Sequence, residues 1–117
     1  MESFAYQKYL RISSKKLVRL VSPLRGTSVE EALAAMQQLP SPHTNLVAKA
    51  IKSAYANLKV KKEEDITEKD AIIKSVIVEQ SFRLKRLNPR ARGRRDIIHR
   101  RFSHLKCVVT DEVSSNR

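Results

Sequence analysis

The chain has 117 residues and a mass of 13.4 kDa, a length that suits one domain and leaves little room for a second. No apolar run approaches the roughly 18 residues of a membrane-spanning helix. A single cysteine, Cys107, excludes a disulfide framework and fits a reducing compartment. The first residues show no leader pattern, so we expect the protein to act where it is made. The net charge of +12 favours a polyanionic partner: nucleic acid first, then an anionic membrane surface or an acidic protein.

The first elements in the chain are predicted to be a short strand and a short helix. Apolar side chains at alternate positions predict a strand over residues 4–12, with Phe4, Tyr6, Leu10 and Ile12 on one face. Ser13 or Ser14 can cap the helix that follows, and Pro23 ends it. The apolar face of this helix is made of Leu17, Val18, Leu20 and Val21.

Two longer helices are predicted next. Ser28 and Glu31 have the spacing of a capping box, which predicts a helix that stops before Pro40. Its buried face consists of Val29, Ala32, Leu33 and Met36. Ser41 and Pro42 form another start signal, and apolar residues then recur at helical spacing as far as Leu58. Residues 59–70 are polar and have no periodicity, so we expect a solvated, mobile loop there.

The last third of the chain predicts a long β-hairpin. One face of its first strand carries Ile72, Val76, Val78, Phe82 and Leu84, and the other face carries Ile73 and Ile77. In its second strand Leu105, Cys107 and Val109 alternate toward one face, with Phe102, His104 and Lys106 on the opposite face. Asn88, Pro89 and Gly93 mark the turn between the strands.

Together these elements predict an α+β fold, in which three helices pack on a small antiparallel three-stranded sheet with a long protruding β-hairpin. In a single domain over residues 1–117, residues 4–82 and 104–111 form the globular part and residues 112–117 a polar tail. Residues 83–103 are too charged to pack on a core and are expected to project as an extended arm. Ten residues beyond the core, at ~3.3 Å each, give an arm of roughly 30 Å.

The positive charge is concentrated in this arm. Residues 83–106 contain ten basic residues and one acid, Asp96, so they carry +9 of the net charge, and the other 93 residues carry +3. Most of the basic residues are Arg, which stays charged, binds phosphate bidentately and stacks on bases. The arm is therefore predicted to bind RNA. The alternative is a basic signal or disordered arm, which the flanking strands disfavour.

A second, weaker basic patch surrounds the first helix, at Arg11, Lys15, Lys16, Arg19 and Arg25. Cations at a helix start oppose the helix dipole, which favours an anionic partner. An ordinary solvated face is an equally good interpretation. Asn57, near the end of the third helix, is either a cap or an RNA contact.

The sequence offers little that could support catalysis. The three histidines and Cys107 do not have the spacing of a metal site, and neither Gly26 nor Gly93 lies in a phosphate-binding loop. Cys107 alternates with apolar residues, so we expect a buried structural thiol and not a nucleophile. We expect no enzyme activity, no metal and no cofactor.

Several segments resemble the large-subunit ribosomal protein twenty-two family, in the right order over about residues 5–111. Residues 9–16, 24–33 and 52–57 are similar to its helical half, and residues 84–94 and 103–105 to its hairpin and C-terminal signature. The Pro-Arg-Ala-Arg-Gly-Arg run at 89–94 is the most specific match. The chain departs from the family's usual residues at Ser14, Asn88, His99 and Phe102. Its length resembles the bacterial or plastid members.

This resemblance implies an α+β domain on the outside of the large ribosomal subunit, with a hairpin that reaches through ribosomal RNA to the nascent-peptide exit tunnel. It implies binding to large-subunit ribosomal RNA, a role in its assembly, and contacts with neighbouring ribosomal proteins and the nascent peptide. No membrane contact and no homo-oligomer are expected. The location implied is the cytoplasm, within the ribosome, or the plastid stroma for a plastid-encoded chain.

The predicted sites follow from the basic patches and from this resemblance. The predicted RNA-binding residues are Arg11, Lys15, Lys16, Arg19, Arg25, Arg83, Lys85, Arg86, Arg90, Arg92, Arg94, Arg95, Arg100, Arg101, His104 and Lys106. The resemblance implies a tunnel-lining tip formed by Leu87, Asn88, Pro89, Arg90, Ala91, Arg92 and Gly93. A stand-alone basic RNA chaperone or regulator is the alternative function, and it would wash off large subunits at high salt.

Overall fold

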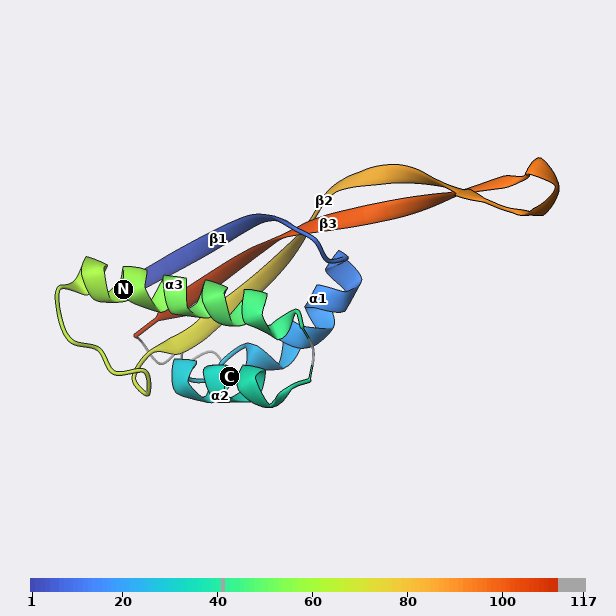
Figure 1. The fold of residues 1–117 in the computed structure, drawn as a ribbon. Helices are drawn as coiled ribbons and strands as arrows, with labels where there is room; N and C mark the ends of the chain where they lie inside the picture. Colours follow the sequence, from blue (N-terminus) through green and yellow to red (C-terminus); the bar gives the residue numbers. More distant parts are fainter. Residues whose placement is uncertain (41, 112–117) are drawn as a thin grey trace.

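Three helices cover one face of a three-stranded antiparallel sheet in the computed structural model, which describes residues 1–40 and 42–111 (Figure 1). In chain order the elements are β1 (Glu2–Leu10), α1 (Ser14–Val21), the 3-10 turn η1 (Ser22–Leu24), α2 (Val29–Gln38), α3 (Thr44–Lys62), β2 (Ile72–Pro89), the 3-10 turn η2 (Ala91–Gly93) and β3 (Arg95–Thr110). The strand order β1-β3-β2 places the last strand in the middle of the sheet. The predicted α+β fold is confirmed.

The core is built from the apolar faces of the helices and the inner face of the sheet. Leu17 and Val21 of α1 are buried, as are all four residues predicted for the inner face of α2, whereas Val18 is 46% exposed. Ser28 Oγ accepts a hydrogen bond from the Glu31 N–H at 3.3 Å, so the cap predicted at the start of α2 is present. No Phe or Tyr is among the buried residues of the described chain.

Helix α3 differs from its prediction at both ends. It begins at Thr44, two residues after Pro42, and Ser41 lies outside the described residues. It ends at Lys62, so the loop predicted from residue 59 is wrong over its first four residues. Three lysines in the last turn are favourable at the negative end of the helix dipole, and this exposed turn needs no apolar periodicity.

The connection from α3 to β2 is attached to the core at one point. Ile66 is buried, and the Tyr55 hydroxyl donates a hydrogen bond to its carbonyl oxygen. These contacts attach the middle of residues 63–70 to the core, although the polar sequence predicted a solvated, mobile loop there. An apolar residue in a polar run is the signal that could have identified this anchor.

The first half of β1 faces the opposite way from the predicted alternation, whereas Leu10 and Ile12 contact the core as predicted, and the strand ends at Leu10 instead of residue 12. Ala5 packs toward the helices and is 6% exposed, whereas Phe4 is 58% exposed and Tyr6 38%. The register shifts between Gln7 and Leu10, where a bulge interrupts the pairing with β3. Small side chains face inward here because α3 packs directly over this strand.

A second bulge changes the faces of β2. The register shifts between Ile73 and Ser75, so that Ile73, Val76 and Val78 contact the core together, although the sequence pattern placed Ile73 on the other face. Residues Leu105, Cys107 and Val109 of β3 are fully buried, as predicted. Ser103 is also fully buried, and its hydroxyl donates to the Ile12 carbonyl at 2.9 Å.

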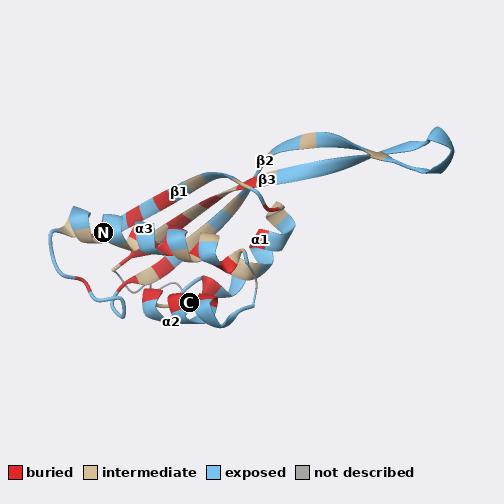
Figure 2. Cartoon of the chain, in the orientation of Figure 1, coloured by how far each residue is buried: buried red, intermediate tan, exposed pale blue. Residues whose placement is uncertain are grey.

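On the side of Ser103 that leads to the tip, β2 and β3 leave the three-stranded sheet as a twisted two-stranded ribbon (Figure 1). Pairing continues to Pro89 opposite Arg95, and almost every residue from 83 to 101 is exposed (Figure 2). This ribbon, residues 83–101, is called the arm below, and the rest of the described chain is called the body. The molecule is 65 Å long and 25 Å across in both other directions. The predicted tail, 112–117, lies outside the described residues.

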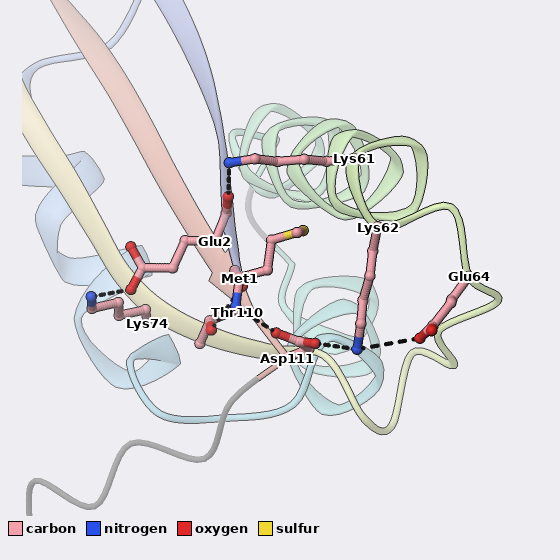
Figure 3. Close-up of polar contacts among 8 residues, drawn as sticks. All are labelled: Met1, Glu2, Lys61, Lys62, Glu64, Lys74, Thr110 and Asp111. Atoms are coloured by element: carbon pink, nitrogen blue, oxygen red, sulfur yellow. Dashed lines mark hydrogen bonds and ion pairs between the residues drawn. The ribbon is translucent and has the colours of Figure 1, made fainter.

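A polar cluster closes the end of the sheet farthest from the arm (Figure 3). Asp111 pairs with Lys62 of α3 and with the amino group of Met1 at 3.1 Å, and Glu2 pairs with Lys74. Hydrogen bonds from Lys62 and from the Met1 amine lower the pKa of Asp111 to about 2. The cluster ties α3, β1, β2 and the end of β3 together through charge pairs at the surface.

Candidate nucleic-acid interface

The arm presents its cations without a hydrophobic core beneath them. Its two strands are joined by backbone hydrogen bonds, and nearly all of their side chains are exposed to solvent. Arg83 lies directly opposite Arg101 in the register. Like charges at opposed positions destabilise a strand pair, and this repulsion is relieved when an anion lies between them.

The tip of the arm has an irregular backbone. Arg92 and Gly93 both adopt left-handed conformations, with φ of +61° and +70°. The turn is closed by a hydrogen bond from the Arg90 N–H to the Arg94 carbonyl at 2.7 Å. No atom lies within 4 Å of where a Gly93 Cβ would stand, so glycine serves the backbone conformation at this position. Arg90 pairs with Asp96 at 2.6 Å, the one ion pair of the arm among described residues.

The start of α1 and the root of the arm face each other across two open grooves. One is lined by Ser14, Lys15, Gln80, Ser81, Arg83, Arg101 and Phe102. The other, of about 670 Å³, is lined by Arg11, Ile12, Ser13, Lys16, His43, Leu84, His99, Arg100, Arg101 and Phe102. Neither groove is lined by an acidic side chain of the described chain. The fold thus brings together the two basic patches that the sequence places about 70 residues apart.

The electrostatics of α1 suit the same kind of ligand. Its N-cap Ser13 makes no side-chain hydrogen bond to the first turn, and that turn contains no acid. The free N–H groups and the cations around them make this end of the helix favourable for anions. Of the interpretations left open for this patch, the grooves favour an anionic partner. Arg19 and Arg25 are exposed but do not line the grooves.

Two predicted contact residues, His104 and Lys106, and Asn57, for which two interpretations were open, lie elsewhere and have partners within the protein. His104 Nδ1 accepts a hydrogen bond from the Tyr9 N–H at 3.1 Å. The Lys106 ammonium lies over the Phe4 ring, 4.9 Å from its centroid. Both side chains belong to the face of the sheet that no helix covers. Asn57 donates to the Phe4 carbonyl at 3.0 Å, so it joins α3 to β1 instead of capping the helix.

Sequence reasoning missed the polar residues Gln80, Ser81 and His43, which line the grooves, because nothing in their local pattern distinguishes them. It also missed the aromatic side chains on the open face of the sheet. The signal available for these was the alternation of Phe4 with Tyr6, interpreted as an inward-facing pattern. Clusters of potential metal ligands are absent from the described residues, and no helix there is long and apolar enough to span a bilayer.

Cys107 carries no chemistry in this arrangement. Its side chain is fully buried, and burial raises the pKa of the thiol to about 12. A protonated thiol without solvent access is a poor nucleophile. The structural role predicted for Cys107 agrees with this environment.

An α+β body that carries a long basic hairpin defines a class of small proteins with an extended cationic surface. The model of the family described as ribosomal protein L22p/L17e matches residues 5–110. The large ribosomal subunit protein uL22 of Desulforamulus reducens is 40% identical over 96% of this chain and 97% of its own length. The uL22 proteins of Carboxydothermus hydrogenoformans and Clostridioides difficile are 37% and 39% identical, over 95% and 96% of this chain and over 96% and 99% of their own lengths. The chain therefore belongs to the ribosomal protein L22p/L17e family.

Proposed function

We propose that the protein is a structural component of the large ribosomal subunit that binds large-subunit ribosomal RNA. The observation that carries this proposal is the meeting of the arm with the start of α1 in two grooves lined by cations and free of acids. Residues 83–106 carry a net charge of +9 with a single acid, and the other 93 residues carry +3, so the remainder of the chain has no surplus of negative charge to neutralise this segment. The phosphates of a folded RNA supply that neutralisation, and Arg binds them bidentately.

The body and the arm have different tasks in this proposal. The grooves and the cations around α1 hold the body at the surface of the RNA, with Arg19 and Arg25 as additional phosphate contacts. The arm passes between RNA helices, and its tip, residues 87–93, lines the nascent-peptide exit tunnel. By contacting several RNA segments at once, the protein assists assembly of the subunit. Neighbouring ribosomal proteins and the nascent peptide are its other partners.

The relatives named above are bacterial, and we propose the same setting, a ribosome of the bacterial type, for this chain. Nothing in these relatives favours the plastid alternative. A structural role needs no catalytic site, in keeping with the environment of Cys107. His104 and Lys106 belong to the proposed RNA-binding surface, on the open face of the sheet. His104 contributes indirectly, by accepting the hydrogen bond that holds Tyr9 in place.

Sedimentation of ribosomal subunits from cells that express a tagged copy of the protein tests this proposal. We expect the protein to remain with large subunits after a high-salt wash, because many buried phosphate contacts dissociate slowly. A stand-alone RNA chaperone would be released by the same wash, and that result would overturn the proposal. The salt dependence of binding to a large-subunit RNA fragment is a second test. Its log–log slope grows by about 0.7–0.9 for each phosphate contact, so a slope near zero would exclude this mode of binding.

A further inference from the structure

The aromatic residues of this chain are on its surface. Of three Phe and three Tyr, five lie on the open face of the sheet, opposite the helices, at Phe4, Tyr6, Tyr9, Phe82 and Phe102. The sixth, Tyr55, is on α3. Aromatic rings bury more apolar area than any other side chain, and a fold that needed them for stability would place them inside. The buried residues of the described chain include none of them.

Tyr9 reaches this face only because of the bulge in β1. Strict alternation would turn residue 9 toward the helices, together with Ser3 and Ala5. Instead Tyr9 adopts a left-handed conformation with φ of +60°, which is unfavourable for a residue other than glycine, and its side chain is 59% exposed. The hydrogen bond from its N–H to His104 Nδ1 holds this conformation. Bulges that redirect a side chain are common at functional sites.

The redirected ring joins a cluster at the root of the arm. Tyr9 lies 5.7 Å from Phe82 and meets His104 edge-on at 5.0 Å between ring centroids. Phe82 stacks on Phe102 at 4.6 Å, which fixes its orientation, and Phe82 is still 47% exposed. The chain continues from Phe82 directly into Arg83. A base that stacked on the exposed rings would therefore have an arginine beside it for its phosphate.

We propose that Tyr9 and Phe82 form a stacking site for an unpaired RNA base on the open face of the sheet. The site rests on the proposed RNA-binding function and adds to it a surface that distinguishes single-stranded from duplex RNA. Aromatic side chains on a sheet face take unpaired bases in this way, because every base presents a π face. RNA is favoured over a protein partner because the cluster is continuous with the most basic segment of the chain.

Fluorescence and affinity measurements on the intact protein test the proposal with two probes. One is a short oligouridine that carries a single 2-aminopurine, and the other is an RNA duplex of equal charge. Tyr9→Leu and Phe82→Leu keep apolar bulk and remove the ring. We expect each to weaken binding of the single strand about tenfold, because one stacking contact is lost, and to leave duplex binding unchanged. The salt slope should stay as in the wild type, since no phosphate contact is removed.

Val60→Ala is the control, since Val60 is an apolar side chain, 79% exposed, on α3 and away from the open face and the grooves; it should bind both probes normally. Phe82→Tyr retains the ring and should bind as the wild type does. If a leucine variant does not fold, the wild type still tests the stacking site, because stacking of the base on a ring should quench the 2-aminopurine fluorescence. Normal single-strand binding by both leucine variants, or absence of quenching, would overturn the stacking site and point to a protein-docking or packing role. Failure of the wild type to bind either probe would overturn the proposed function as well.

Discussion

The body and the arm of this protein are stabilised by different means, although they share two strands. Every buried hydrophobic residue of the described chain lies in the body, and none lies between residues 83 and 101. The body also pairs cations with acids, as Lys62 does with Asp111 and Lys74 with Glu2. The arm has one such pair, Arg90 with Asp96. The comparison indicates that the body is stable by its own packing, whereas the arm depends on a partner for neutralisation. Substitutions in the buried interior of the body should therefore change stability, whereas substitutions in the arm and on the proposed RNA-binding surface of the body should change binding.

The largest effect on stability is expected at the centre of the core. Cys107→Asp places a carboxylate among fully buried residues of β3, and we expect a loss of at least about 4 kcal/mol of unfolding free energy, enough to unfold the body. Circular dichroism melts measure this loss. Cys107→Ala is the control, which removes the thiol without adding charge and should remain folded. In the native wild type the thiol should resist a thiol reagent, and rapid modification would contradict the strand register described above.

A smaller loss is expected where the arm joins the body. Ser103→Ala removes the buried hydrogen bond to the Ile12 carbonyl, and we expect a cost of about 1–2 kcal/mol because that carbonyl is left unsatisfied. Chemical denaturation at equilibrium measures the difference. Ser81→Ala, at a half-buried serine whose side chain makes no hydrogen bond to a described residue, should be close to neutral. Equal effects of the two substitutions would show that the buried hydrogen bond contributes nothing.

The polar cluster at the other end of the sheet should contribute in a pH-dependent way. The pKa of Asp111 is about 2 in the folded protein, below its usual value of 3.8, so the folded state favours the ionised form. Its contribution is present above the usual value and is lost as the pH falls through the folded pKa. We expect Asp111→Asn to lower Tm slightly at neutral pH and to approach the wild type between about pH 4 and pH 2. A Tm difference as large at pH 2 as at pH 7 would assign the effect to something other than charge.

The smallest effect on stability, and the largest on binding, is expected at the tip. Replacing Arg90, Arg92 and Arg94 by Ala should leave Tm unchanged or slightly raised, because repulsion among the arm cations is relieved. The same variant should be poorly incorporated into large subunits, and its log–log salt slope for an RNA fragment should fall by about two to three. Lys59→Ala, Lys69→Ala and Lys49→Ala together form a control of equal charge loss outside the arm and grooves. A Tm many degrees lower in the tip variant would show that the arm packs on the body.

Local patterns in the sequence predicted the elements whose geometry is set locally. The spacing of Ser28 and Glu31 located the start of α2, and the alternation of Leu105, Cys107 and Val109 gave the facing of β3 correctly. The bulges in β1 and β2 could not be predicted in this way, because they depend on pairing with a strand that is far away in the sequence. Without them, the predicted faces of Phe4 and Ile73 are wrong. The predicted face of Phe82 is wrong for the same reason, because the register of β2 shifts again between Gln80 and Arg83.

The candidate site was predictable to the same extent. The concentration of charge over residues 83–106 identified the arm, because a charge count needs no knowledge of the fold. The charge count could not predict that Lys15, Arg83 and Arg101 line the same groove, because their proximity depends on α1 lying beside the root of the hairpin. The position of Tyr9 on the open face depends on a single residue's backbone conformation and has no signature in the sequence.

The strand order of the sheet has a consequence for how the chain can fold. β3 is the last strand to be synthesised, yet it lies between the other two. β1 therefore has no strand to pair with until β3 has been made, and Glu2 pairs with Thr110 at the end of β3. Until then β1 and β2 are both edges with unpaired backbone groups. The short connection through the tip allows β2 and β3 to pair first, since closing a small loop loses little chain entropy. We expect docking of β1 to be a late step in folding, because it pairs residues from the two ends of the chain; it completes the hydrophobic core and the polar cluster.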